Sequence, residues 1–260
     1  MTLLGWSVVY VDAVQVFIRW LPVIGTIAKI QRPSHLPYLP LFIPVLKKYK
    51  VNRVSLDPGY MQTKDELKQW IFSLKKWVSV DVSLNLQTKT ILVDVTPAFE
   101  VVFSRLTSAK RRAVRRAEKN NIVVTVSHDI DVLILTKSRA AGFLGGITTT
   151  GLRQLWKAFS PKNAAILLAF QQSSPIGGLL ILFYNKTAYY WIAGATKKGK
   201  KLFAPTLLVF EALKLAHKKR CTFFDFIGVW DERLPKRYTN WFGFTKFKEG
   251  FGGKPVYYPI

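Results

Sequence analysis

The sequence predicts an α/β (α+β) fold in which two units each build a mixed sheet. Runs rich in β-branched and aromatic residues, typical of strands, alternate with amphipathic helical segments over most of the 260 residues. Three apolar strands, a basic loop, a long helix and a further strand follow one another in the second half. In both halves the chain passes from strands through a helix to a strand that ends at glycine, near Asp57-Pro58-Gly59 and at Phe226-Ile227-Gly228. These two similar halves favour a tandem arrangement.

The net charge indicates the kind of partner. The chain has 39 Lys and Arg against 15 Asp and Glu, which gives a formal net charge of +24. That excess predicts attraction to polyanions, which include nucleic acid, an anionic membrane surface and phosphorylated substrates.

The cysteine, the histidines and the apolar runs limit the chemistry and the compartment. Cys221 is the single cysteine and the three histidines are scattered, so we expect no disulfide, no metal and no other cofactor. No apolar run approaches the ~20 residues that a spanning helix needs, and no signal peptide is recognisable after Met1. We therefore expect a cytoplasmic protein without a transmembrane segment. The charge leaves open a peripheral contact with an anionic membrane at its inner face.

The first half is expected to begin with two or three antiparallel strands in residues 6–30, followed by a proline-rich loop. Thr63 and Glu66 have the spacing of a capping box, so a helix should begin after Thr63. Ser108 is the expected N-cap of a strongly basic helix that ends at asparagines. The other expected elements of this half are helix 41–49, strand 51–56, helix 64–78, and strands 81–86 and 90–95.

The second half has the order of elements that defines the expected fold. Strands are expected at 122–126, 164–170, 176–184, 188–195 and 223–228, and helices at 129–141, 149–159 and 206–219. A basic loop at 196–205 precedes the long helix. This order is that of a GNAT acyltransferase, in which the loop faces a phosphate-bearing acyl donor. By that analogy we expect tandem GNAT-like (acyl-CoA N-acyltransferase-like) domains, a shortened one at 1–119 that ends in the basic helix and a second one at 120–260.

The last stretch, residues 241–253, combines aromatic rings, lysines and glycines. Lysines between rings can hold phosphate together with a base or sugar face, and glycines let the backbone approach a ligand closely. The alternative is a final hairpin whose lysines face water.

An ordered set of motifs in the chain resembles the FemABX peptidyltransferases, which use aminoacyl-tRNA to add amino acids to the peptide stem of peptidoglycan precursors. The motifs lie at residues 90–96, 110–120, 189–195, 204–205, 224–228 and 247–253. The resemblance implies a pair of GNAT-like domains, with aminoacyl-tRNA and a UDP-linked or lipid-linked peptidoglycan precursor as partners.

The resemblance also implies site residues. The family's Phe-Lys pair falls on Phe247 and Lys248, which are the expected catalytic residues. A fixed ammonium there would stabilise the oxyanion that forms when an amine attacks the ester of the charged tRNA. No Ser-His-Asp or Cys-His set is needed, because the ester is already activated. Tyr190, Asp225 and Lys246 are the expected substrate-binding residues.

This chain departs from the family on the acceptor side. The family's Arg-x-x-x-Tyr contact to the muropeptide falls on Ile147 and Gly151, and the second of its paired tyrosines is Ile192. The donor-side motifs are therefore kept while the usual acceptor contacts are largely absent.

The basic helix and the basic loop are the expected tRNA-binding elements. A cationic surface neutralises phosphates, although part of such a surface is always plain solvated charge. Asp225 could instead satisfy backbone donors at a strand end, and Tyr190 could be a packed residue of the sheet. The expected tRNA-binding residues are Lys110, Arg111, Arg112, Arg115, Arg116, Lys197, Lys198, Lys200 and Lys201.

Three functions compete at this point. The first is an aminoacyltransferase that moves an amino acid from aminoacyl-tRNA to the peptide stem of a peptidoglycan precursor. The second is a GNAT-type N-acyltransferase that uses acyl-CoA, which the presence of only one loop glycine, Gly199, disfavours. The third is a non-catalytic relative that binds RNA or an anionic surface.

Overall fold

The computed structural model describes residues 5–82, 86–141 and 149–260. They form two compact units: unit 1 comprises Met1–Lys89 and Val256–Ile260, and unit 2 comprises Thr90–Pro255. The expected domain boundary between residues 119 and 120 falls inside unit 2, where a helix passes into a strand. Residues 83–85 of one expected strand, and Ile147, lie outside the described residues.

Unit 1 is built on a five-stranded mixed sheet in the order β1-β2-β3-β4-β5. The first three strands are antiparallel, as the sequence predicted, and β3, β4 and β5 run parallel. The strands are β1 (Ser7–Val11), β2 (Val14–Leu21), β3 (Gly25–Gln31), β4 (Val51–Asp57) and β5 (Ser79–Val82).

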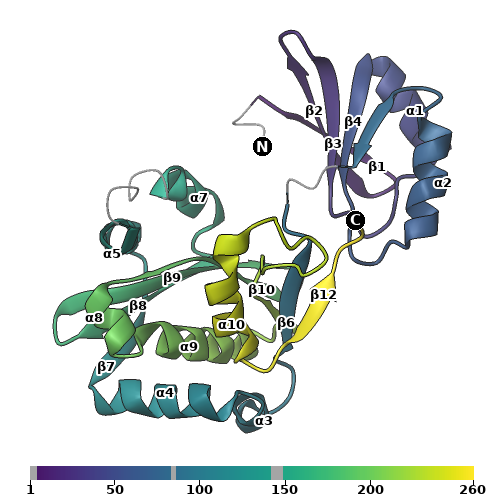
Figure 1. Cartoon of the computed structure of the whole chain (residues 1–260). Coiled ribbons are helices and arrows are strands. Elements are labelled where there is room, and N and C mark those ends of the chain that lie inside the picture. Colours follow the sequence, from purple (N-terminus) through teal and green to yellow (C-terminus); the bar gives the residue numbers. More distant parts are fainter. Residues whose placement is uncertain (1–4, 83–85, 142–148) are drawn as a thin grey trace. The chain divides into compact units, whose positions relative to one another are not determined.

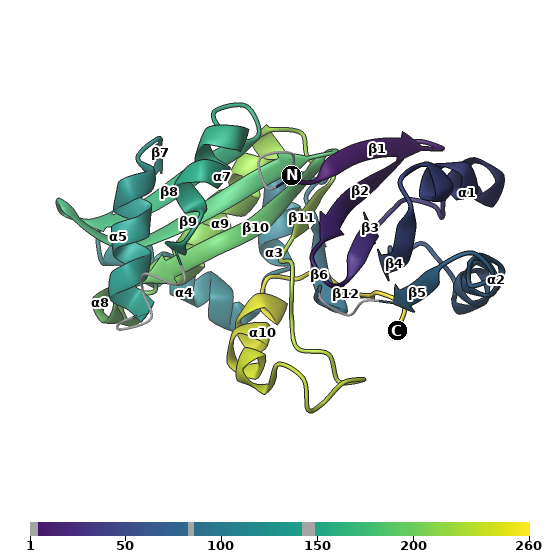
Figure 2. The same ribbon diagram turned by 90° about the horizontal axis from the view of Figure 1, so that it is seen from above.

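Two helices, α1 (Leu39–Lys48) and α2 (Lys64–Leu74), cover one side of this sheet (Figure 2). Both bury their apolar residues against it, among them Phe42 and Trp70, whose rings stack. The predicted capping box at the start of α2 is confirmed. The Thr63 hydroxyl accepts from the Glu66 N–H, and the Glu66 carboxylate accepts from the Thr63 N–H at 2.8 Å.

Unit 2 is built on a seven-stranded mixed sheet in the order β12-β6-β11-β10-β9-β8-β7. Strands β7 to β10 are antiparallel, β10 and β11 are parallel, and β6 is antiparallel to β11. The strands are β6 (Lys89–Asp94), β7 (Ile122–Ser127), β8 (Ala164–Gln171), β9 (Ser174–Tyr184), β10 (Thr187–Ala195), β11 (Phe223–Asp225) and β12 (Lys254–Tyr257).

Helices cover both faces of this second sheet (Figure 1). Helices α4 and α9 lie on one face, and α5 and α7 lie on the other. The helices are α3 (Phe99–Ser104), α4 (Ser108–Lys119), α5 (Ile130–Ala141), α7 (Leu152–Phe159), α8 (Lys197–Lys201), α9 (Ala204–Lys218) and α10 (Phe242–Glu249), with a 3₁₀ turn, η3 (Thr239–Trp241). The expected fold class, two mixed sheets with helices, is confirmed.

Four local expectations were wrong. The basic loop contains a short helix, α8, whose N-terminus is capped by the Thr196 hydroxyl. The N-cap of α4 is Thr107, not Ser108, because the Thr107 hydroxyl accepts from the Lys110 N–H. Strand β11 ends early because Ile227 takes a left-handed conformation, with φ of 57°.

The fourth correction concerns the last stretch, which forms the helix α10 and not a hairpin strand. Its buried residues, Thr245 and Lys248, lie three residues apart on one helical face. The Thr245 hydroxyl donates to the Trp241 carbonyl one turn earlier, at 2.8 Å. The rings and lysines of this stretch are therefore distributed around a helix, and they do not alternate between the two sides of a strand.

Within the described ranges, no helix is both long enough and apolar enough to cross a membrane.

Candidate functional site

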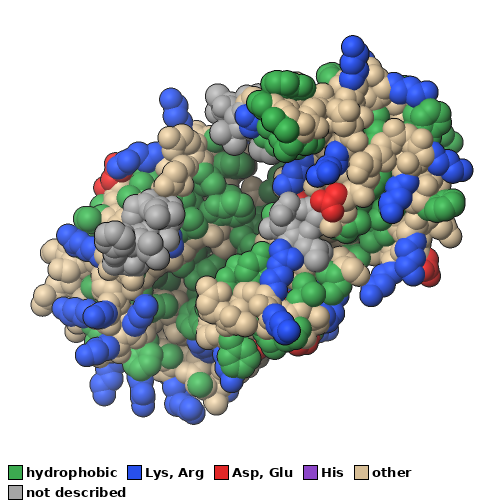
Figure 3. All heavy atoms as spheres, turned by 45° about the horizontal axis from the view of Figure 1, so that its top comes forward, with side chains coloured by type: hydrophobic (Ala, Val, Ile, Leu, Met, Phe, Trp, Pro, Cys, Tyr) green, Lys and Arg blue, Asp and Glu red, His purple; other side chains and the backbone are tan. Residues whose placement is uncertain are grey.

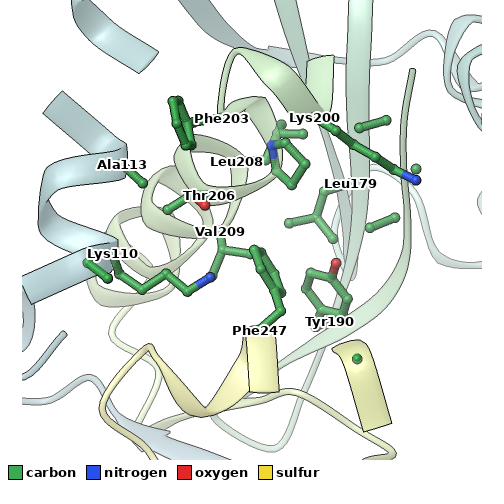
Figure 4. Close-up of a pocket in the computed structure, with 16 residues that line it drawn as sticks. Lys110, Ala113, Leu179, Tyr190, Lys200, Phe203, Thr206, Leu208, Val209 and Phe247 are labelled. Atoms are coloured by element: carbon green, nitrogen blue, oxygen red, sulfur yellow. The ribbon is translucent and has the colours of Figure 1, made fainter. Parts of the chain in front are cut away.

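A pocket of about 630 Å³ opens in unit 2 (Figure 4). Its walls come from α4, strands β9 and β10, α8, the start of α9, and α10. Most of the lining is apolar, and the polar side chains in it are Lys110, Tyr190, Lys200 and Thr206. This is the composition of a site that buries an apolar or aromatic ligand and fixes it by a few polar contacts.

The N-terminus of α9 forms part of the wall. Phe203 takes a left-handed conformation at the N-cap, and Pro205 and Thr206, in the first turn, line the pocket. The first turn of a helix carries a partial positive charge, which favours an anionic group nearby.

Lys110 reaches from α4 into the pocket toward Phe247 (Figure 4). Its Nζ lies 3.7 Å from the centre of the Phe247 ring and 5.0 Å from that of Phe251. Its stem passes over Gly250, where a Cβ would lie 2.8 Å from the lysine Cγ, so a side chain at 250 would displace it. Burial lowers the pKa of Lys110 to about 8. The sequence placed Lys110 among surface contacts to tRNA, but the structure places it inside the pocket.

Lys248, the expected catalytic lysine, is buried on α10. Its Nζ donates to the Phe226 carbonyl at 2.8 Å and to the Gly228 carbonyl at 2.7 Å. Burial lowers the pKa of Lys248 to about 8, and the negative charge of Asp225 opposes that change. A local window of sequence does not predict this burial, because the two acceptors come from a turn about 20 residues earlier in the chain.

Asp225 holds that turn. Its carboxylate accepts from the Thr90 hydroxyl on β6 and from the Ile227 N–H at 2.6 Å. Ile227 is left-handed, and the carbonyls on either side of it are those that accept from Lys248. Asp225 therefore makes internal hydrogen bonds that stabilise the end of β11. Sequence reasoning missed Thr90, although it opens one of the FemABX-like motifs.

Tyr190 lies between the pocket and Lys248. It lines the pocket, its ring packs 5.6 Å from that of Phe226, and the Lys248 Nζ lies 5.4 Å from its centre. Burial raises the pKa of its hydroxyl, so Tyr190 is a neutral donor at physiological pH. A register shift in β10 follows directly, between Tyr190 and Ile192.

The remaining expected site residues are divided between the pocket and the surface. Lys200 lines the pocket, while Lys246 is exposed and lies 4.6 Å from the Phe242 ring centre. Arg111 donates to the carbonyls of Ser104 and Leu106, so its charge is engaged locally. The exposed members of the expected tRNA-binding set are Arg112, Arg115, Arg116, Lys197, Lys198, Lys200 and Lys201. Figure 3 shows many more basic than acidic side chains on one face of the molecule.

In the described part of the chain, no group of three or more His, Cys, Asp or Glu is placed to hold a metal ion.

The sequence did not single out Thr206 or the apolar wall at Leu179, because nothing in the local sequence distinguishes these residues from core residues. The arrangement suits acyl transfer to an amine, with ammonium groups and a phenol near one pocket.

The chain matches the FemAB family over residues 162–258. This segment contains β8, β9, β10, α8, α9, β11 and α10, and it supplies every wall of the pocket except α4. A search of curated proteins by sequence gave no match.

Solved structures share the fold over almost the whole chain. FemX has a TM-score of 0.74 at 14% identity, with 99% of this chain and 87% of that chain covered. The C-terminal domain of a protein assigned as a lysylphosphatidylglycerol synthetase in Agrobacterium fabrum has a TM-score of 0.65 at 13% identity, covering 98% and 82%. A tandem GNAT protein from the clavulanic acid biosynthesis pathway has a TM-score of 0.52 at 10% identity, covering 94% and 76%. The expected resemblance and the tandem GNAT-like fold are confirmed.

Proposed function

Because residues 162–258 match the FemAB family, we propose that this chain is an aminoacyltransferase that moves an amino acid from aminoacyl-tRNA to the peptide stem of a peptidoglycan precursor. The observation that carries the proposal is the position of the match. The matched segment supplies Tyr190 and Phe247 to the lining of one pocket, and Lys248, whose Nζ lies 5.4 Å from the centre of the Tyr190 ring. The reaction takes place in the cytoplasm, where charged tRNA is available.

The pocket receives the aminoacylated end of the tRNA. Its apolar walls suit the faces of the base and the ribose, and Phe247 offers a ring at the side where Lys110 lies. Lys110 and the first turn of α9 meet a phosphate of that end. The exposed arginines of α4 and lysines of α8 contact the phosphates of the tRNA body.

Lys248 acts on the reacting ester. A lysine ammonium has three donors, and two of those of Lys248 are engaged by the turn carbonyls. The third stabilises the oxyanion that forms when the acceptor amine attacks the ester carbonyl carbon. The new C–N bond forms, the tetrahedral intermediate collapses, and the ribose oxygen of the tRNA leaves and takes up the proton that the amine has lost.

The pKa of about 8 leaves Lys248 mainly protonated at neutral pH, so the ammonium that stabilises the oxyanion is the main form of this side chain.

The acceptor is a UDP-linked or lipid-linked precursor. We assign Tyr190 and Asp225 to the acceptor side of the reacting centre, Tyr190 by its hydroxyl and Asp225 through the turn that it holds. Lys246, which is exposed on α10, meets a phosphate of the acceptor. An anionic membrane is a further peripheral partner where the precursor is lipid-linked.

Single-turnover transfer tests the proposal. Charged tRNA is mixed with the full chain and with UDP-linked or lipid-linked precursor, and the amide product is measured by mass spectrometry. An acceptor whose amine is acetylated is the control and should give no product. Phosphatidylglycerol is offered as a parallel acceptor, because a protein assigned as a lysylphosphatidylglycerol synthetase shares the fold. Absence of an amide product with every amino acid and every precursor would exclude the proposed reaction.

A second candidate is acyl transfer from acyl-CoA, which the fold of the tandem GNAT protein favours. Gly199 opposes it, because this glycine is buried and a Cβ on it would clash with the Ile176 carbonyl. It packs against β9 and does not offer its backbone to a pyrophosphate. Calorimetry with acetyl-CoA separates the two candidates, since binding at micromolar concentration would favour the second.

A further inference from the structure

The turn between β2 and β3 exposes consecutive apolar residues. Trp20, Val23 and Ile24 have 67%, 107% and 53% of their surface exposed, and Pro22 between them is exposed as well. Leu21 pairs with Gly25 across the turn, so these side chains stand at the tip of a hairpin. Soluble proteins rarely expose an apolar run of this length unless it binds a partner or a membrane.

The backbone of the tip adds a second observation. Val23 is left-handed, with φ of 69°. A β-branched residue is disfavoured in that region, where Asn or Gly is usual. A valine at this position therefore costs stability within the folded chain and contributes no burial to its core.

Lysines surround the tip at the same end of the unit 1 sheet. Strands β3 and β4 are parallel with Thr26 opposite Val51, so the turn that follows α1 lies beside the hairpin. Strands β4 and β5 are parallel as well, which brings the end of α2 to the same edge. The Lys47 Nζ lies 4.2 Å from the centre of the Trp77 ring, and this contact joins the end of α1 to the residues that follow α2. The exposed basic residues at this end are Lys47, Lys48, Lys50, Arg53, Lys75 and Lys76.

Acidic residues are absent from the three segments that form this end, 19–26, 47–53 and 74–79. Asp12 lies in the β1–β2 turn and Asp57 ends β4, so both lie at the opposite edge of the sheet. Asp65 and Glu66 are in the first turn of α2, whose last turn leads to Lys75 and Lys76. Asp81, the remaining acidic residue of unit 1, lies in β5 opposite Ser55 in the middle of β4. Unit 1 thus has most of its exposed lysines gathered at one end, and its apolar tip projects from that basic end.

We propose that this end of unit 1 docks on the surface of an anionic lipid bilayer, with Trp20, Val23 and Ile24 inserted between headgroups. Lysines near such a surface are attracted to anionic lipids, and Trp favours the boundary between headgroups and acyl chains. Trp77, 52% exposed beside Lys47, adds a second ring at that level. This inference does not rest on the transferase reaction, because every residue in it belongs to unit 1.

A nucleic acid fits the surface less well than a bilayer. Aliphatic side chains such as Val23 and Ile24 offer no ring on which a base can stack, and a projecting tip does not follow a phosphate backbone. An apolar tip gains free energy when it enters an apolar phase. The combination of a projecting aliphatic tip and a lysine rim therefore favours lipid.

Co-sedimentation of the full chain with vesicles tests the proposal. One vesicle population is pure phosphatidylcholine and the other contains phosphatidylglycerol at two-fifths of the lipid. The double variant Lys75→Ala, Lys76→Ala should lower the partition coefficient on the anionic vesicles about 25-fold, because each lysine near the surface contributes roughly fivefold. Lys64→Ala with Lys68→Ala removes the same charge from the opposite end of α2 and should change binding little.

A tip variant tests the insertion separately. Val23→Asn with Ile24→Ser should lower the partition coefficient about tenfold or more, and Asn suits the left-handed conformation, so the fold should be kept. Circular dichroism checks the fold. Failure of the wild-type chain to sediment with the anionic vesicles, equal effects of the two lysine pairs, or unchanged binding of the tip variant would each overturn the proposal. A loss of RNA binding in the Lys75/Lys76 and tip variants, with vesicle binding kept, would assign the surface to RNA and overturn it as well.

Discussion

Two lysines of unit 2, one in the α4 wall of the pocket and one beside the turn after β11, have pKa values that burial lowers to about 8, but their surroundings differ. Lys110 faces aromatic rings and has no hydrogen-bond acceptor among the described residues. Lys248 faces two backbone carbonyls at 2.8 and 2.7 Å. The charge of Lys110 is therefore fully available to a ligand, while Lys248 commits two of its donors to the fold.

The two lysines also differ in their relation to the family. Lys248 lies inside the segment that matches the FemAB family, and Lys110 lies outside it. Lys248 thus holds the backbone of a turn, while Lys110, from a helix outside the matched segment, places a charge inside the pocket. Substitutions at the two positions should therefore affect different properties of the protein.

The largest effect is expected for Lys248→Ala. It should lower single-turnover transfer by roughly 100-fold or more, the scale for loss of one preorganised oxyanion donor. It should also lower the free energy of unfolding by about 1–3 kcal/mol, because the Phe226 and Gly228 carbonyls lose their donor. Transfer from charged tRNA and urea denaturation measure the two effects. Lys246→Ala, at an exposed position of the same helix, is the comparison variant: it should lower transfer much less and leave the free energy of unfolding unchanged. Equal, slight losses of transfer for both variants would remove Lys248 from catalysis.

Lys110→Met should come next. It keeps the stem that packs over Gly250 and removes the charge in the pocket, so KM for aminoacyl-tRNA should rise about tenfold while kcat changes less. Lys119→Met, which removes a positive charge at an exposed position of the same helix outside the pocket, is the matched control. Steady-state kinetics at fixed acceptor concentration gives both constants. A loss confined to kcat would instead place Lys110 at the reacting ester.

The pH dependence separates the two lysines further. The ammonium form of Lys248 exists below its lowered pKa of about 8 and is lost as pH rises through that value. Transfer that needs the ammonium should therefore fall by about tenfold between pH 8 and 9.5. Lys248→Arg should restore part of the activity that Lys248→Ala loses, and because the guanidinium stays charged, this descending limb should disappear. A limb that persists in Lys248→Arg and disappears in Lys110→Arg would assign the titration to the pocket.

The smallest effect is expected at the exposed arginines of α4. Replacing Arg112, Arg115 and Arg116 by Ala should weaken binding of all tRNAs alike and lower the salt slope by roughly 0.7–0.9 for each lost phosphate contact. Filter binding at several salt concentrations measures this slope. An unchanged salt slope would show that the outer face of α4 is solvated surface that makes no contact with tRNA phosphates.

Sequence alone predicted the parts of this protein that depend on local pattern. The capping box at Thr63 and Glu66 is such a case, because both partners lie within one helical turn. The antiparallel strands in residues 6–30 are another, since period-two patterns and turns specify them.

Sequence alone could not predict the surroundings of the two lysines. The acceptors of Lys248 come from the turn at Ile227, and Lys110 packs over Gly250, from the far end of unit 2. In α10, the sequence alternates rings and lysines over a few residues, as a strand would. The structure forms a helix there because Thr245 and Lys248, three residues apart, are buried on one face. Such contacts depend on tertiary packing, which a short window of sequence does not contain.

The place of β6 in the sheet has a consequence for how unit 2 folds. Strand β11 pairs with β6, and the hydrogen bond between Thr90 and Asp225 joins residues 135 positions apart in the chain. Contacts of such long sequence separation form slowly, because the loop between them must be closed first. On the ribosome, the turn that engages Lys248 cannot form until almost the whole chain has been made. The turn that Lys248 engages is therefore among the last parts of the nascent protein to fold, and slower or faster translation of residues 95–222 should change the yield of folded unit 2.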